Sequence, residues 1–256
     1  TTWKPSGNWD QSAGLRFRST LSRDSRAANF RELYYRQIIG AGGTFGFCEP
    51  FNVQPRDPCT FDLRGNVDLE PEKSDTVTFG VVLTPEDFLP GFSFAADYFR
   101  INIEDAILQA NSAAVLNGCR GPAMDPGFCN QLVLGPPTDP TNPLSNIEVL
   151  NAFATNGSAY TFKGVDFTGS YSMQLENSSL YIRLLATKMI DQLFQNTPGG
   201  DFINVVGQTG TGNNFLADNQ PAAEWLANLS ATWTRGPLSL TGQVRRVKSV
   251  QQAEQI

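Results

Sequence analysis

The sequence predicts an all-β protein in which antiparallel strands follow one another up and down through one large sheet. Three observations predict this class. Short segments alternate between apolar and polar residues, and short and long connections alternate between these segments. No run approaches the ~18 consecutive apolar residues that a membrane-spanning helix needs. With 256 residues, the chain is long enough for one large all-β unit.

The connections between the expected strands differ strongly in length. The short ones lie near Pro5–Ala13, Pro85–Gly91, Glu176–Ser178 and Arg235–Pro237. The long ones cover Asp24–Lys73, Leu108–Ser158 and Asp191–Ala222. The long ones run to roughly 30–50 residues, where the usual connection has about 4–6. Because successive connections of an up-and-down sheet lie at opposite ends, all the short ones share one end. This is the plan of a transmembrane β-barrel with long extracellular loops.

Each expected strand has one apolar and one polar side. A stub that ends at Pro5 precedes Gly14–Ser22, the first strand with clear alternation, and Thr76–Leu83 repeats the pattern. Phe92–Tyr98 continues it. At Tyr98–Phe99 the alternation slips by one residue, which predicts a β-bulge.

Four further strands complete the expected set of about seven to eight. They are Val165–Gln174, Leu180–Thr187, Trp225–Thr234 and Leu238–Arg245. Trp225 and Trp233 share the apolar side and lie roughly 20 Å apart along the membrane normal, as two aromatic girdles would. Core tryptophans of a soluble sandwich would give the same pattern.

Six charged residues fall on the polar sides of these strands: Arg16, Arg18, Asp97, Asp166, Arg183 and Arg245. In a large barrel this side faces the lumen or a plug, and in a soluble sandwich it faces solvent. The pattern alone does not separate the two.

The composition argues against several functional classes. The chain contains no His, which removes the Ser-His-Asp and Cys-His machineries and the usual catalytic zinc sites. We therefore expect no enzyme and no metal site. The glycine-rich run Gly40–Gly46 lacks the Lys-Ser/Thr of a phosphate loop, so no cofactor is expected. A net charge of −6 without a basic stripe makes nucleic acid an improbable partner.

The four cysteines form two local pairs, Cys48 with Cys59 and Cys119 with Cys129. Both pairs lie in long connections on the same end of the sheet. Two disulfides in these small loops would each stabilise by ~2–3 kcal/mol and imply an oxidising compartment. Free thiols and other pairings remain open.

Little regular structure is expected in the long connections. Ser145 and Glu148 fit a capping box, which predicts a short helix over Asn146–Ala154. Ser112–Asn117 is a candidate for another helical turn.

The residues after the first alternating strand include Arg26, Ala27, Asn29, Glu32 and Leu33. This run closely resembles the barrel segment of TonB-dependent outer-membrane receptors, in which an arginine, a small residue, an asparagine and then Glu-Leu follow a strand. Ala28 stands where that family commonly has proline.

Three further stretches, in the right order, resemble the same family. Asn66, Leu69, Pro71, Glu72 and Ser74 match its Asn-x-x-Leu-x-Pro-Glu strand opening. Ala96–Ile107 is similar to its next strand, and Gly164–Asp166 is similar to the opening of a later one.

The resemblance covers almost the whole chain. It implies a barrel of about 22 strands with an N-terminal plug, which carries scarce ligands across the Gram-negative outer membrane with energy relayed by TonB. Residues 1–256 would then be a single partial barrel domain, truncated at both ends. Its implied partners are outer-membrane lipid, the TonB complex through the missing plug, and a small ligand such as a siderophore, vitamin or glycan.

Two other functional classes remain open. The chain could be a complete eight-stranded barrel that acts as an adhesin or structural protein, which needs the stub before Pro5 to be a true strand. It could also be a secreted β-sandwich that binds a partner and stays soluble without detergent.

Overall fold

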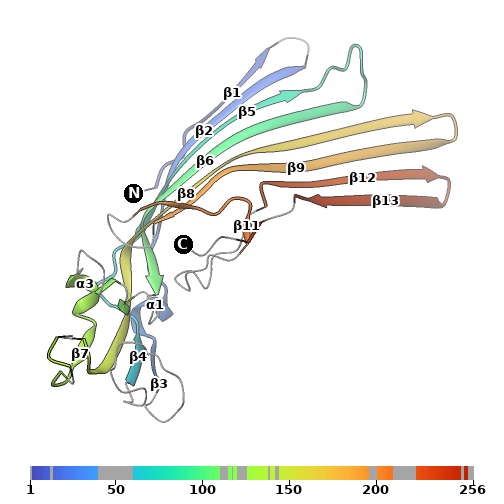
Figure 1. The fold of residues 1–256 in the computed structure, drawn as a ribbon. Helices are drawn as coiled ribbons and strands as arrows, with labels where there is room; N and C mark the ends of the chain where they lie inside the picture. The colour runs from blue at the N-terminus through green and yellow to red at the C-terminus, as the bar shows by residue number, and fades with distance from the viewer. Residues whose placement is uncertain are drawn as a thin grey trace.

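The main feature of the computed structural model is one curved antiparallel sheet (Figure 1). The structure describes residues 2–11, 14–39, 60–109, 115–116, 118–119, 126–137, 139–141, 144–195, 201–209, 223–248 and 251–252. The strands on the path of the sheet are, in order, β1 (Ser6–Gln11), β2 (Leu15–Arg26), β5 (Glu72–Leu83), β6 (Phe92–Gln109), β8 (Ile147–Leu175), β9 (Ser178–Gln195), β12 (Trp225–Arg235) and β13 (Leu238–Val247). The predicted all-β, up-and-down class is confirmed.

Shorter elements occupy the long connections. They are α1 (Phe30–Tyr34), β3 (Arg36–Ile39), β4 (Thr60–Arg64), α3 (Pro126–Cys129), β7 (Leu132–Leu134), β10 (Ile203–Asn204), β11 (Gln208–Thr209) and β14 (Gln251–Gln252). Val115 and Leu116 are helical, inside the helical turn expected at Ser112–Asn117. Within the described residues, no helix is both long and apolar enough to cross a membrane.

The main sheet is open at both of its outer strands. Among the described residues β1 pairs only with β2 in the sheet, and β13 pairs only with β12. A complete eight-stranded barrel would need β1 and β13 to pair with each other. The structure therefore corrects the small-barrel alternative.

The short connections lie where the sequence places them, with one exception. β5 joins β6 through 84–91, β8 joins β9 through Glu176 and Asn177, and β12 joins β13 through Gly236 and Pro237. The exception is Ser6–Gln11: the sequence predicts a turn here, but these residues form β1 and pair with β2. This stretch has little apolar alternation, because Trp9 is its one large apolar residue, so backbone pairing decides its structure.

Two turn glycines connect neighbouring strands at the end with the short turns. Gly14 and Gly91 both have a φ of 78°, a region that side chains other than glycine rarely adopt. The Gly14 carbonyl accepts a hydrogen bond from the Thr84 amide at 2.7 Å, and the Gly91 carbonyl accepts one from the Ser172 amide at 2.9 Å. A Cβ at either glycine would lie within 2.2 Å of a backbone oxygen.

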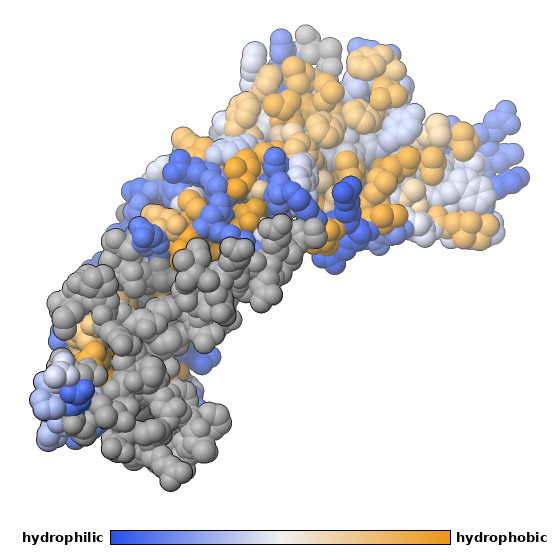
Figure 2. Space-filling view, in the orientation of Figure 1, coloured by the Kyte–Doolittle hydropathy of each residue, from blue (hydrophilic) through white to orange (hydrophobic). Residues whose placement is uncertain are grey.

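The strand register separates the side chains of the sheet into two faces, because directly paired residues of antiparallel strands lie on the same face. One row across the sheet is Leu15, Leu83, Phe94, Gly169, Leu184, Leu229 and Val244. Many large side chains on this face are exposed, including Phe79 at 50% and Leu229 at 47% exposure. Figure 2 shows hydrophobic residues at the surface along the strands of the sheet. We call this side the apolar face. It packs against no second sheet in the described chain, which corrects the sandwich alternative.

Two local predictions were wrong, both because of strand pairing. Asn146–Ala154 forms no helix: from Ile147 onward it belongs to β8, and it pairs with β4 and β7. The bulge expected at Tyr98–Phe99 is also absent, since both residues pair regularly with β5 and β8. The irregularity lies further along β6, between Ile103 and Ala106, where Asp105 has a φ of 54°.

The buried core lies in a compact unit around the first residues of β8, which precede the part of this strand that pairs with β6 and β9 (Figure 1). We call this unit the loop module; it comprises β3, β4, α3, β7, the start of β8 and the helical residues near Cys119. The core residues are Phe61, Val115, Leu116, Cys119, Phe128, Leu132, Ile147, Leu150 and Ala152. The long connections are therefore folded, and part of their apolar content is buried within them.

Candidate functional site

A row of polar residues crosses the centre of the sheet on the side opposite the apolar face, which we call the polar face. The register aligns Arg18, Gly80, Asp97, Asp166 and Thr187 across β2, β5, β6, β8 and β9. Arg18 donates from Nε to Asp97 Oδ1 at 2.6 Å and from its terminal nitrogen to Oδ2 at 2.5 Å. This is the bidentate geometry of a strong, charge-assisted pair.

Gly80 allows this ion pair to form across an intervening strand. Arg18 and Asp97 are separated by β5, and Gly80 is the β5 residue aligned with both. A Cβ at Gly80 would lie 2.0 Å from Asp97 Oδ1 and 3.0 Å from Arg18 Cγ. The missing side chain is thus the space that the two charged groups use.

Asp166 lies directly opposite Asp97, so two carboxylates are adjacent on the polar face. Like charges in this position repel each other. Each carboxylate has its own donor: Arg18 for Asp97, and the Thr187 hydroxyl for Asp166 at 2.6 Å. The arrangement is a polar network open to solvent rather than a buried acid–base pair.

The other three predicted residues lie on the same face, farther apart. Arg16 pairs with Asp10 of β1. Arg183 is aligned with Ser170 and Ser230, and Arg245 with Asn228. Within the described residues, neither Arg183 nor Arg245 contacts a carboxylate. All six predicted residues therefore share one face, and its role as a lumen wall stays a prediction.

An aromatic cluster on the polar face was missed by the sequence analysis. Phe194 lies 5.1 Å from Tyr160 and 6.0 Å from Phe162 between ring centroids, edge to face in both pairs. The Phe99 ring covers Gly164, where a Cβ would lie 2.6 Å from it. The shift in alternation at Tyr98–Phe99 was the signal in the sequence that could have predicted this cluster. Beyond that point, next to the loop module, apolar side chains lie on the polar face.

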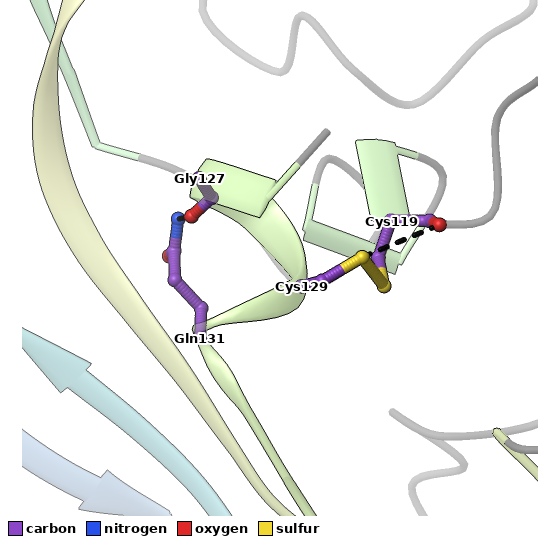
Figure 3. The surroundings of a disulfide bond; sticks show 4 residues. All are labelled: Cys119, Gly127, Cys129 and Gln131. Atoms are coloured by element: carbon purple, nitrogen blue, oxygen red, sulfur yellow. Dashed lines mark hydrogen bonds between the residues drawn. A yellow bond between two sulfur atoms is a disulfide. The ribbon is translucent and has the colours of Figure 1, made fainter. Parts of the chain in front are cut away.

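The disulfide expected between Cys119 and Cys129 is present and lies at the edge of the loop-module core (Figure 3). Cys119 is 1% exposed, and the Phe128 ring packs over Gly118, where a Cβ would lie 2.4 Å from it. The disulfide thus joins the helical turn at Cys119 to α3. The other predicted pair, Cys48 and Cys59, lies outside the described residues.

Gln131 connects α3 to β8 inside this module. Its side chain is buried, and its Nε2 donates to the Gly127 carbonyl at 3.0 Å, as Figure 3 shows. Its Oε1 accepts from the Phe153 amide at 3.1 Å, and its carbonyl accepts from the Asn151 amide at 2.8 Å. Buried amides of this kind are well satisfied and fix a single arrangement.

On the other side of the module sheet, Asp62 of β4 is held by two arginines. Arg64 donates from Nε to Asp62 Oδ2 at 2.7 Å, and Arg36 of β3 donates to the same oxygen at 3.1 Å. The Asp62 side chain is 4% exposed, and its Oδ1 has no hydrogen-bond partner in the described part of the chain. The hydrogen bond from Arg64, with that from Arg36, holds the pKa of Asp62 below its ordinary value although burial opposes this.

The family-like motifs meet where the main sheet joins the loop module. Arg26 donates to both oxygens of Glu72 at 2.7 Å and also bonds Glu32. Glu72 in turn accepts from the Ile107 amide at 2.7 Å. Asn29 caps α1 through a reciprocal capping box with Glu32. We call this arrangement the clasp; it ties β2, α1, β5 and β6 together.

An open, curved sheet with one apolar face, one charged face and a folded module at the end with the long connections is a segment of a transmembrane β-barrel wall. The chain belongs to the family described as TonB dependent receptor-like, beta-barrel, whose profile matches residues 1–254. This is a family of outer-membrane transport receptors. The resemblance inferred from the motifs is confirmed.

Solved structures give the same fold at low sequence identity. A mutant of the ferric enterobactin receptor PfeA from Pseudomonas aeruginosa has a TM-score of 0.57 and 18% identity over 96% of this chain and 27% of its own. The siderophore receptor PirA from Acinetobacter baumannii has a TM-score of 0.52 and 15% identity over 97% of this chain and 30% of its own. The chain thus spans less than a third of the length of either structure. No curated protein matches it.

Proposed function

We propose that this chain forms part of the barrel wall of an outer-membrane receptor that takes up a scarce ligand. In this proposal lipid contacts the apolar face, and the polar face lines the ligand path. The observation that supports it is the register itself, which places an uninterrupted apolar row and the Arg18–Asp97–Asp166 row on opposite faces of one sheet. Uptake itself requires no covalent chemistry, only such a path and a means of opening it.

The energy source and the ligand class belong to the same proposal, and membership of the family supports them. Uptake would be driven by the TonB complex through a plug supplied outside these residues. The two structures named above are described as a ferric enterobactin receptor and a siderophore receptor, which favours a ferric siderophore over a vitamin or glycan. The basic and hydroxyl groups of the polar face, with the aromatic cluster near the module, suit an anionic, partly aromatic ligand.

A labelling experiment tests the orientation of the sheet. Single nitroxide labels at Phe79 and Leu229, and at Thr78 and Ser230 on the opposite face, are introduced into the full-length gene product in proteoliposomes. Labels at Phe79 and Leu229 should collide with dissolved oxygen, which concentrates in lipid, and labels at Thr78 and Ser230 with a water-soluble relaxation agent. Equal water accessibility of all four sites would overturn the barrel-wall proposal.

An uptake experiment tests the activity. Cells that carry the full-length gene product are supplied with radioactive ferric siderophores, cobalamin or labelled oligosaccharides, with and without a functional TonB. Accumulation of one class that depends on both the receptor and TonB is expected. Accumulation that persists without TonB would contradict the energy source, and the absence of accumulation for every class would contradict the uptake role.

A further inference from the structure

The amide group of Asn156 connects β8 to two other segments where the main sheet joins the loop module. Its nitrogen donates to the Glu70 carbonyl, just before β5, at 2.9 Å and to the Asp105 carbonyl of β6 at 2.8 Å. Its oxygen accepts from the Glu70 amide at 2.8 Å. We call these three hydrogen bonds the junction. Both polar atoms of the side chain are therefore held by the backbone of other segments.

The junction lies at an irregular part of the pairing between β6 and β8. The register between these strands shifts twice between Ile103 and Leu108. Asp105 has a φ of 54° and Gly157 a φ of 116°, as expected where bulged strands leave the regular ladder. The Asn156 side chain thus supplies hydrogen bonds at a point where the ladder is interrupted.

The next residue makes Asn156 chemically reactive. Two asparagines of the chain are followed by glycine, Asn117 and Asn156, and of these Asn156 lies within the described residues. The backbone nitrogen that follows an asparagine can attack the side-chain carbonyl carbon, and glycine presents no Cβ to hinder this approach. Asn156 with Gly157 is therefore a candidate for spontaneous deamidation.

The reaction consumes water and releases ammonia. The Gly157 nitrogen forms a bond to Cγ of Asn156, the bond from Cγ to the amide nitrogen breaks, and ammonia leaves with the proton of the Gly157 amide. Water then opens the cyclic imide, which gives aspartate or isoaspartate at position 156. No oxidant, cofactor or enzyme is required.

The folded structure holds this reaction back. Attack requires Cγ of Asn156 to turn onto the Gly157 nitrogen. The junction instead holds the amide group against the Glu70 and Asp105 backbones, which lie 86 and 51 positions away in the sequence. The unfolded chain therefore lacks this protection, and local opening of the folded protein removes it for part of the time. Deamidation should thus occur only in the opened junction.

The clasp controls this opening. Glu72 accepts from the Ile107 amide at 2.7 Å, and Arg26 holds Glu72 in place from β2. Ile107 lies two residues beyond Asp105, whose carbonyl bonds Asn156. Loss of the clasp would free this part of β6 and, with it, one side of the junction.

Deamidation would make the opening permanent. The new carboxylate has only acceptors, and it would replace the nitrogen that donates to the Glu70 and Asp105 carbonyls. Oxygen would then face oxygen at both contacts, and acceptors left without donors are costly. The junction therefore cannot re-form with the same bonds.

We propose that Asn156 is a site of spontaneous deamidation that stays closed while the clasp is intact and reacts once the junction opens. Deamidation then leaves the loop module permanently less well held to the main sheet. This inference goes beyond the proposed function, because it depends on neither lipid nor ligand.

Peptide mapping by mass spectrometry measures the site directly. The full-length gene product is incubated in proteoliposomes and, in parallel, unfolded in urea, and the conversion of Asn156 to aspartate and isoaspartate is followed with time. Conversion should be on the order of 100-fold slower in the folded protein, because all three hydrogen bonds must open first. Equal rates in both states would overturn the protection, and an absence of conversion in urea would overturn the site.

Two substitutions test the chemistry and the role of the clasp. Gly157→Ala, compared only in urea because Gly157 has a φ of 116°, should slow the conversion markedly, since the added Cβ hinders attack. In the folded protein Glu72→Gln should accelerate the conversion about fivefold. The matched control Glu70→Gln should not, because the junction uses only the Glu70 backbone. A rate for Gly157→Ala equal to that of the unmodified chain would overturn the mechanism, and equal rates in the two glutamate variants would overturn control by the clasp.

Two further substitutions test the consequence. Asn156→Asp places the charge of the product at the junction, and Asn156→Ala removes the same bonds without a charge. Hydrogen exchange of residues 105–109 should rise in both variants and more in Asn156→Asp. The same comparison is made on the unmodified protein aged after insertion, so that the result does not depend on the folding of a variant. Protection of the deamidated protein equal to that of the intact protein would overturn the loosening.

Discussion

Among single residues, Gly80 decides whether an ion pair can form across β5. A strand glycine usually weakens a sheet because it has no side chain to pack. Here the absent side chain lets Arg18 and Asp97 meet across β5. Both charged side chains are partly exposed, at 47% and 27%, so water screens the pair and its contribution to stability is modest.

Substitution of Gly80 by Ala should separate this ion pair. The new Cβ occupies the place of Asp97 Oδ1, and both charged groups can turn into water, so the free energy of unfolding should fall by only about 0.5–1 kcal/mol. Urea unfolding of the full-length gene product in lipid vesicles measures it. Gly242→Ala is the matched control, because a Cβ there meets nothing within 4 Å; a change as large as that for Gly80→Ala would refute the steric explanation.

Asp62 should make the loop module sensitive to acid. Its pKa in the folded protein is lowered by Arg64 and Arg36, so its contribution to stability is present above its unfolded pKa of about 3.9 and is lost as the pH falls through the folded value. Hydrogen exchange of the β4 amides, corrected for intrinsic rates, should accelerate below about pH 4. Asp62→Asn should exchange faster at neutral pH and lose this pH dependence; an unchanged pH profile would contradict the assignment.

Among elements, the loop module differs in kind from the main sheet. The sheet exposes both faces, whereas the module buries a contiguous apolar core and is closed by a disulfide and by Gln131. The clasp through Arg26 and Glu72 connects the two. We therefore expect that the module can lose its packing while the main sheet stays folded.

Removal of the disulfide should test this independence. Cys119→Ser with Cys129→Ser opens a loop of 10 residues, which should cost the module about 2–3 kcal/mol. We expect faster proteolysis within residues 126–137 and lower ligand uptake, with unchanged membrane insertion. Uptake equal to that of the unmodified protein would refute a role of the module in ligand capture.

Glu72 should be essential to the clasp. Glu72→Gln removes the charge that binds Arg26 and weakens the acceptor of the Ile107 amide, so the free energy of unfolding should fall by about 1–3 kcal/mol. Glu70→Gln is the control, because among the described residues Glu70 makes only backbone hydrogen bonds, to the Asn156 side chain. Hydrogen exchange at residues 105–109 should rise in the first variant alone, and equal protection in both would contradict the clasp.

For the whole molecule, the open edges of β1 and β13 set the limit on autonomous folding. Unpaired strand edges are not tolerated in lipid, and these two strands do not pair with each other. Residues 1–256 expressed alone should therefore fail to give heat-modifiable migration on gels, while the full-length gene product shows it. A heat-modifiable, monomeric product of residues 1–256 would show that the edges close in another way.

The alternation of apolar and polar residues was sufficient to predict the strands, but local patterns did not predict the structure of the long connections. The two sides of β2, β5, β8 and β12 follow from alternation alone, and the register agrees with them. The capping pattern at Ser145 and Glu148 was misleading, since β4 and β7 offer strand partners to the same residues. The true capping box lies at Asn29 and Glu32, in a run identified only as a family motif.

The amino-acid sequence by itself determined which side chains share a face, because in a strand this depends only on a period of two residues. The tertiary structure alone decided which residues meet. The Arg18–Asp97 pair joins residues 79 positions apart, and the alignment of Arg100 with Lys163 depends on the register between β6 and β8. Register is set by turns, shear and backbone pairing across the whole sheet, and no local pattern contains that information.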